Sequence, residues 1–313
     1  MDPLQIADSS FVVSNGKRDR TPFVAPGTFC FVARHTRICP CATPKCTGLQ
    51  CFRKYEIALH PITSYSRIFT RTSVYLLPSL YSSRMALAHS KSDPENAEDF
   101  YKKAEEYWSN ASRDIDGMLG GFAHLHTPDI RASKAFIKKL RTKNFLVDMN
   151  RAADCGAGIG RVTRHLLLPL FKNVVMVEPV TELLEKSVTY VGDKGNVKRI
   201  PVGLQNFYPD VGSFDMIWIQ WCSGHLTDSD MIQFLERCVE GLTKEGVIVF
   251  KDNLSAQQES EFDSEDNSWT RPERLVLELF EKSGLRVVAE NVQTGFPSGM
   301  YKVKMFALKP ARK

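Results

Sequence analysis

Short apolar runs alternate with longer amphipathic stretches from about residue 150 onward, and this alternation is the main structural signal of the chain. The apolar runs have the length of strands, and most of the stretches between them have the spacing of helices. Buried strands are predicted at 152–154, 174–177, 197–202, 214–221, 247–251, 286–290 and 301–308. Helices are predicted from the glycine-rich segment at Gly156 through Leu170, and at 182–190, 228–242 and 273–283. This order predicts an α/β fold with a doubly wound, mostly parallel seven-stranded sheet.

Two more helices are predicted ahead of the sheet. The apolar positions of 99–108 recur at helical spacing, and a second helix runs from about Asp129 to Leu140. We interpret Asp129 as part of the N-cap region of that second helix. A glycine-rich turn at 117–121 separates the two helices.

Residues 1–92 differ from the rest of the chain in pattern and in charge. They show no sustained period, and they contain twelve Lys and Arg against four Asp and Glu, a net charge of +8. Residues 93–313 have a net charge of −3. We therefore predict a basic, Cys-, Ser- and Arg-rich, disordered extension (1–92) followed by one folded domain (93–313). The expected localisation is the cytoplasm or the nucleus, and organelle targeting by the extension stays open.

Composition also narrows the classes of partner and cofactor. No apolar run approaches the ~20 residues that cross a bilayer, so no membrane span is expected. Because the basic charge is confined to 1–92, we expect no direct nucleic-acid binding by the folded domain, whose mildly acidic balance suits a cationic substrate. Cys39, Cys41, Cys46 and Cys51 lack the paired spacing of structural zinc sites, so no metal is predicted. The oligomeric state is not determined by the sequence.

A glycine loop follows the first predicted strand, with the sequence Asp-Cys-Gly-Ala-Gly-Ile-Gly from Asp154 to Gly160. Gly156 and Gly158 allow the backbone to approach a ligand closely, because they have no side chain. Glu178 ends the next strand, 24 residues after Asp154, where an acid can accept hydrogen bonds from ribose hydroxyls. The two features predict a nucleoside-containing cofactor, and by themselves they leave both NAD and S-adenosylmethionine open.

Polar residues after the glycine loop and the later strands favour S-adenosylmethionine. The guanidinium of Arg161, directly after the loop, can pair with a carboxylate such as that of the methionine moiety. Leu204 and Gln205 follow the third strand, where an apolar side chain and an amide would bracket an adenine. Gln220 ends the fourth strand.

Five segments, in this order, resemble the protein α-N-terminal methyltransferases. They are 116–121 (DGMLGG), 154–161 (DCGAGIGR), 217–221 (IWIQW), 224–228 (GHLTD) and 251–253 (KDN). The resemblance extends from about Glu95 to Leu308. It implies a class I, Rossmann-like methyltransferase fold with added N-terminal helices, at about 95–142, that close over the substrate as a lid. It also implies methyl transfer from S-adenosylmethionine to the free α-amine of proteins that begin X-Pro-Lys or X-Pro-Arg.

The resemblance further implies roles for single residues. The expected cofactor contacts, with Gly158 added from the loop argument, are Gly156, Gly158, Arg161, Glu178, Leu204, Gln205 and Gln220. The expected substrate contacts are Trp108, Leu119, Trp221, Asn253, Asp263, Ser268 and Tyr301. Trp221 would pack on the substrate proline, and Asp263 would meet the Lys or Arg at position three. Asp266 and His225 would orient the amine and remove its proton, which makes them the predicted catalytic residues.

The chemistry of amine methylation is consistent with these roles. A protonated α-amine, with a pKa of ~8, has no lone pair, so the site must favour its deprotonation before transfer. Two alternatives stay open from the sequence. One is a small-molecule N- or O-methyltransferase with the same cofactor site, and the other is an inactive or regulatory relative that binds partners through the basic extension.

Overall fold

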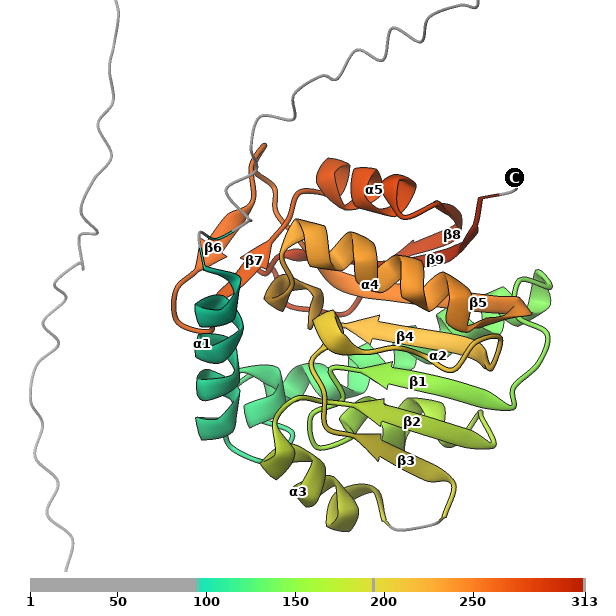
Figure 1. Cartoon of the computed structure of the whole chain (residues 1–313), viewed down its shortest axis with the longest axis horizontal. Coiled ribbons are helices and arrows are strands. Elements are labelled where there is room, and N and C mark those ends of the chain that lie inside the picture. The colour runs from blue at the N-terminus through green and yellow to red at the C-terminus, as the bar shows by residue number, and fades with distance from the viewer. Residues whose placement is uncertain (1–93, 95, 193–194, 312–313) are drawn as a thin grey trace, which may run out of the picture. The chain divides into compact units, whose positions relative to one another are not determined.

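A seven-stranded sheet forms the centre of the computed structural model, which describes residues 94, 96–192 and 195–311 (Figure 1). Its strands are β1 (Arg151–Cys155), β2 (Asn173–Val177), β3 (Val197–Ile200), β4 (Phe214–Gln220), β5 (Leu242–Leu254), β8 (Leu285–Val292) and β9 (Lys302–Pro310). They lie in the order β3-β2-β1-β4-β5-β9-β8. The first five are parallel, and β9 is antiparallel to both β5 and β8. The predicted mostly parallel seven-stranded α/β fold is confirmed. The extension predicted for 1–92, with its cysteines, lies outside the described residues.

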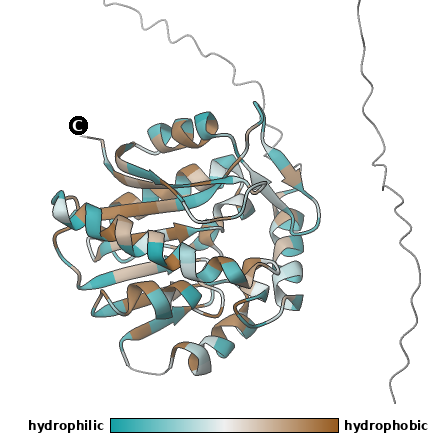
Figure 2. Cartoon of the chain, turned by 180° about the vertical axis from the view of Figure 1, so that it is seen from behind, coloured by the Kyte–Doolittle hydropathy of each residue, from teal (hydrophilic) through white to brown (hydrophobic). Residues whose placement is uncertain are grey.

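Helices cover both faces of the sheet because side chains alternate between the faces along each strand. Along β4, Ile217 and Ile219 pack into one core with α4 (Asp228–Gly241) and α5 (Glu273–Lys282). Met216 and Trp218 point into the opposite core, which α2 (His126–Thr142) covers. The helix α3 (Thr181–Val191) packs near β2 through smaller clusters. Seen from behind, the central strands are largely apolar and the helices carry hydrophilic stretches (Figure 2).

The first helix, α1 (Ala97–Asn110), lies beyond the carboxyl ends of the parallel strands (Figure 1). Asn96 caps it by accepting a hydrogen bond from the Asp99 amide at 3.2 Å, a favourable N-terminal arrangement. The Tyr101 hydroxyl donates to Asp230 of α4, and Asn267 Nδ2 donates to the Phe100 carbonyl at 2.8 Å. These contacts hold α1 above the edge of the sheet where ligands bind in such folds.

Three local expectations differ from the structure. The acidic stretch after β5 was not predicted to contain strands, yet it forms the hairpin β6 (Glu261–Asp263) and β7 (Ser268–Thr270). The three-residue strands are too short for a period, and a cross-strand contact of Phe262 and Trp269, with ring centroids 4.6 Å apart, helps hold them together. The predicted helix after the glycine loop is present but irregular: residues 161–162 are α-helical, Thr163–Leu167 are π-helical, and the helix ends in a turn at 168–170.

The start of α2 was also placed wrongly. The helix begins at His126, so Asp129 lies inside its first turn and caps nothing with its side chain. The Asp129 side chain is fully buried and paired with two cations from other elements. Because long-range ion pairing leaves no mark in local sequence, the N-cap interpretation was the natural one. Within the described part of the chain, no helix is long and apolar enough to cross a membrane.

Candidate active site

The glycine loop begins where β1 ends and needs glycine for two separate reasons. Gly156 has a φ of 66° and Gly158 a φ of 54°, the left-handed region that side chains disfavour. A Cβ on Gly156 would also lie 2.4 Å from the Cβ of Cys222, which follows β4. The loop backbone therefore passes so close to Cys222 that no side chain fits between them at Gly156. The other side of the loop faces the cavity described below.

Glu178 lies directly after β2 beside this loop. Its Oε2 accepts a hydrogen bond from the Gly158 amide at 2.9 Å, and its Oε1 accepts one from the Val180 amide at 3.0 Å. Burial raises the pKa of Glu178 to about 7, although the two amides oppose the shift. A carboxylate has lone pairs beyond these two bonds, so it can still accept hydrogen bonds from ribose hydroxyls.

A partly open cavity lies above the loop, at the carboxyl ends of the parallel strands where ligands bind in such sheets. The predicted site residues that line it are Trp108, Gly156, Gly158, Arg161, Glu178, Leu204, Gln205, Gln220, Trp221 and His225. Segments far apart in sequence thus meet at one place. Sequence reasoning did not single out Tyr101, Glu105 or Cys222, which also line the cavity. No local pattern marks these three positions, since only the placement of α1 and of the turn after β4 brings them there.

Arg161 lines the cavity, and its guanidinium is bound by a residue that does not line the cavity. Its Nη1 donates to Oδ2 of Asp129 at 2.7 Å, and its guanidinium lies 5.6 Å from the centroid of the Trp221 ring. Gln220, also in the lining, donates from Nε2 to Oδ1 of Asp129 at 2.9 Å. Asp129 was missed as a site residue, because its relation to Arg161 and Gln220 depends on how α2 packs on the sheet.

His225 and Trp108 form the opposite side of the cavity. Trp108 Nε1 donates to His225 Nε2 at 2.9 Å, joining α1 to the turn after β4. An indole nitrogen can only donate, so His225 accepts there as a neutral imidazole with its proton on Nδ1, which faces the Asn267 carbonyl at 3.4 Å. Burial lowers the pKa of His225, and the nearby carboxylate of Asp266 opposes that shift.

Two buried polar atoms beside this cavity lack partners among the described residues. Asp266 Oδ1 and Trp221 Nε1 are both buried without a hydrogen bond. Trp221 also has a φ of 52°, an unusual backbone conformation for a bulky residue. Unsatisfied groups and backbone outliers are costly and gather at functional sites, which makes these two residues candidates for contact with a ligand.

The other predicted substrate residues do not line the cavity itself. Asp263 and Ser268 face each other across the β6–β7 hairpin, whose turn contains Asp266. The pKa of Tyr301 is raised by burial and by Glu261 and Asp263, which places Tyr301 within electrostatic reach of the hairpin. Asn253 pairs with β9 in the sheet, and Leu119 is buried in the turn between α1 and α2.

A doubly wound sheet with a glycine loop after β1 and an acid after β2 defines a protein that binds a nucleoside-containing cofactor, and comparison with known proteins decides between NAD and S-adenosylmethionine. A family model described as AdoMet dependent proline di-methyltransferase matches residues 96–309. The chain belongs to this family, and S-adenosylmethionine is its cofactor.

Relatives agree with this assignment. The chain is 51% identical over 222 residues to alpha N-terminal protein methyltransferase 1 of Caenorhabditis elegans, covering 71% of this chain and 95% of that protein. It is 43% identical over 218 residues to N-terminal Xaa-Pro-Lys N-methyltransferase 1 of Mus musculus, covering 69% of this chain and 97% of that protein. The solved structure of a SAM-dependent methyltransferase from Leishmania major has 38% identity and a TM-score of 0.63, covering 67% of this chain and 83% of that chain.

The residues of the cavity fit the cofactor. The glycine loop would receive it, the Glu178 carboxylate would accept the ribose hydroxyls, and the Arg161 guanidinium would meet the carboxylate. Leu204 and Gln205 line the same cavity and would bracket the adenine.

The raised pKa of Glu178 predicts a pH-dependent affinity for the cofactor. Binding of S-adenosylhomocysteine, the reaction product of the cofactor, is expected to strengthen about tenfold from pH 6 to pH 8. Below pH 7 Glu178 is mostly protonated, whereas ribose hydroxyls donate best to the ionised carboxylate, so binding releases a proton and affinity rises with pH through about 7. Titration calorimetry at both pH values measures the change. The variant E178Q should lose this pH dependence, and the same slope in E178Q would contradict the assignment.

Proposed function

We propose that this chain transfers methyl groups from S-adenosylmethionine to the free α-amino group of proteins with an exposed Xaa-Pro-Lys or Xaa-Pro-Arg N-terminus. The names of its relatives from Caenorhabditis elegans and Mus musculus support the acceptor. The structural observation that supports it most is the buried, unpartnered Oδ1 of Asp266 beside His225. A buried carboxylate oxygen in need of a donor suits a cationic amine.

Asp266 would act as the acceptor of the amine proton. The bound cofactor supplies an electrophilic methyl group on a sulfonium, and the amine needs a free lone pair to attack it. An incoming ammonium group can donate to Asp266 Oδ1, which holds it and draws off its proton. Beyond that step, the site accelerates the reaction by holding the amine in line with the methyl group.

His225 would assist as a neutral residue. With Trp108 donating to its Nε2, the imidazole has no free lone pair for the amine in this conformation. His225 would therefore act by fixing the position of Trp108 where the amine is expected to bind, and by shielding Asp266 in part from water. A proton could pass to His225 only after the bond to Trp108 breaks.

The remaining predicted residues would recognise the substrate after its first residue. Trp221 offers a ring face for the proline, and its unpartnered Nε1 can donate to a peptide carbonyl. Asp263 is exposed on the hairpin and carries the charge that a Lys or Arg at position three requires.

Incubation with S-adenosylmethionine and a Ser-Pro-Lys peptide tests the proposal directly. Mass spectrometry should show added methyl groups on the free peptide and none above background on the same peptide with an acetylated N-terminus, because acetylation removes the basic amine. The spectrum also reports how many methyl groups are added. If both peptides gain the same amount, or neither gains any, the proposed acceptor is wrong.

A further inference from the structure

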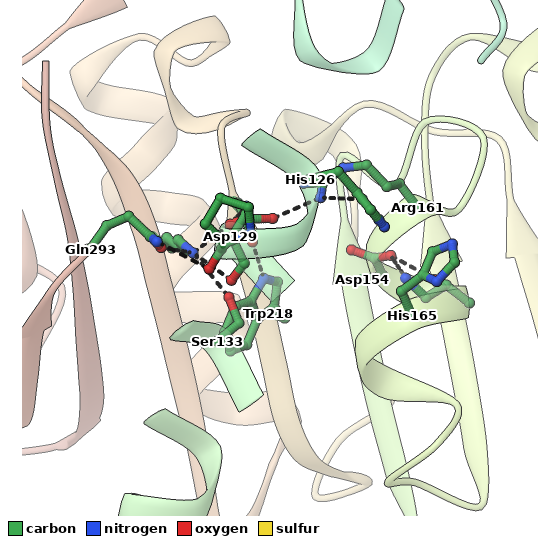
Figure 3. A network of polar contacts seen from close by, with 12 residues as sticks. His126, Asp129, Ser133, Asp154, Arg161, His165, Trp218 and Gln293 are labelled. Atoms are coloured by element: carbon green, nitrogen blue, oxygen red, sulfur yellow. Dashed lines mark hydrogen bonds and ion pairs between the residues drawn. The ribbon is translucent and has the colours of Figure 1, made fainter. Parts of the chain in front are cut away.

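A buried cluster of charges lies behind the cofactor cavity and is centred on Asp129 of α2 (Figure 3). Asp129 is 0% exposed, yet its carboxylate binds side chains from three other parts of the chain. Oδ2 accepts from Arg161 Nη1 at 2.7 Å, and Oδ1 accepts from Lys251 Nζ at 2.5 Å and from Gln220 Nε2 at 2.9 Å. One carboxylate thus joins α2 to β4, to β5 and to the segment after the glycine loop.

A second layer of polar groups fixes these partners. Lys251 Nζ also donates to Ser133 Oγ at 2.9 Å and to Gln293 Oε1 at 2.7 Å. Gln220 Oε1 accepts from the indole of Trp218 at 2.9 Å, so the amide of Gln220 has one orientation. In Figure 3, Ser133, Trp218 and Gln293 gather around Asp129, while Arg161 lies on the side of Asp154. Several hydrogen bonds to one buried carboxylate and its partners hold these side chains in fixed orientations.

The cluster meets the cavity through two of its members. Arg161 and Gln220 line the cavity, whereas Asp129 does not. Arg161 uses Nη1 for Asp129, and among the described residues its Nε and Nη2 have no hydrogen-bond partner. Together these two nitrogens form the edge of the guanidinium that can donate two parallel hydrogen bonds to a carboxylate. Inside the hydrogen-bonded cluster two cations, Arg161 and Lys251, share the single carboxylate of Asp129. The outward donors of Arg161 are thereby left for the carboxylate of a ligand.

We propose that Asp129 is a positioning residue for the cofactor: it aims the Arg161 guanidinium at the carboxylate of S-adenosylmethionine and fixes Gln220 beside it. The inference rests on the cofactor of the proposed function and not on the peptide acceptor. Asp129 would act without touching the ligand, by limiting Arg161 to one orientation before binding. Such preorganisation strengthens binding because less side-chain freedom is lost when the ligand arrives. The other reading is that the cluster only fastens α2 to the sheet.

Two ligands separate these readings. S-adenosylhomocysteine carries the amino-carboxylate, and 5′-methylthioadenosine carries the same nucleoside thioether without it. For D129N, calorimetry should show S-adenosylhomocysteine binding about 10- to 100-fold more weakly, the size expected for loss of a charged hydrogen bond. Binding of 5′-methylthioadenosine should change by less than about threefold. On an R161M background, D129N should weaken S-adenosylhomocysteine binding much less than it does in the wild type, because only the effect through Gln220 remains.

D215N is the matched control. Asp215 is also a buried carboxylate, and it accepts from the backbone amides of Asn150 and Arg151 away from the cavity. D215N should leave both affinities unchanged. If D129N does not fold, D129N/K251M, which also removes the unpaired buried lysine charge, gives the same two measurements. Equal weakening of both ligands, or no weakening of either, overturns the inference. Wild-type protein that binds neither ligand would instead contradict the cofactor itself.

Discussion

Replacement of Gly156 by alanine is expected to weaken S-adenosylhomocysteine binding by at least about 100-fold, an effect of roughly 3 kcal/mol or more. The added Cβ would lie 2.4 Å from the Cβ of Cys222 and 2.9 Å from its Sγ, distances that require the loop or the end of β4 to move. Alanine at a φ of 66° adds a strain of about 1–2 kcal/mol. The glycine loop and Glu178 are connected by the bond from the Gly158 amide, so displacement of the loop also displaces the ribose acceptor.

Gly284→Ala separates backbone strain from displacement of the loop. Gly284 has a φ of 70°, close to that of Gly156, but a Cβ there would meet nothing within 4 Å. It lies at the end of α5 and does not line the cavity. This variant should lose some thermal stability while its affinity for S-adenosylhomocysteine stays as in the wild type. If G156A binds as tightly as this control, the loop does not form the cofactor site.

Asp266→Asn is expected to lower kcat for the Ser-Pro-Lys peptide by about 100- to 1,000-fold, the usual contribution of a positioned proton acceptor. The amide keeps the shape of the side chain but accepts a proton poorly. Because Asp266 does not line the cofactor cavity, affinity for S-adenosylhomocysteine should stay within about twofold of the wild type, which calorimetry can measure. Initial rates over a range of peptide concentrations separate the loss in kcat from any rise in KM caused by weaker attraction of the ammonium group.

Glu265→Gln is the control for charge. Glu265 precedes Asp266 in the hairpin turn and is exposed, so the substitution removes the same unit of charge from the same turn. It should change kcat little, and any effect on KM should fade with added salt, as expected for an exposed charge. Equal losses of kcat in D266N and E265Q would show that the hairpin acts only through its overall charge, and an unchanged kcat in D266N would rule out Asp266 as the proton acceptor.

The sheet was predictable because its signal is local. Successive side chains of a strand point to opposite faces of the sheet, and helices cover both faces, so each central strand is an apolar run. The strands β1, β2, β4 and β5 were therefore all expected near their observed positions. The hairpin β6–β7 was not predictable, because a strand of three residues that includes charged positions is too short to show a pattern that distinguishes it from a loop. Its position against the turn that contains His225 depends on contacts between distant residues.

The site divides in the same way. The glycine loop and Glu178 form one unit within 25 residues, and their bonds to each other follow from strands that are neighbours in the sheet. Trp108 and His225 are 117 residues apart, and Asp129 and Lys251 are 122 apart. The first contact needs α1 to lie beyond the carboxyl ends of the strands, and the second needs α2 to pack on a face of the sheet. No local pattern specifies either placement.

The sequence by itself determined the class of fold and the half of the site that binds the nucleoside, because left-handed glycines and an acid after a buried strand have narrow local requirements. Only the tertiary structure decided which charges meet. It placed Asp129 behind Arg161 although the sequence indicated a helix cap, and it left Asp266 with a buried oxygen open to a donor. The physical reason is that periodicity reports which face of an element is buried, whereas the partner of a buried charge is set by the elements that pack against it.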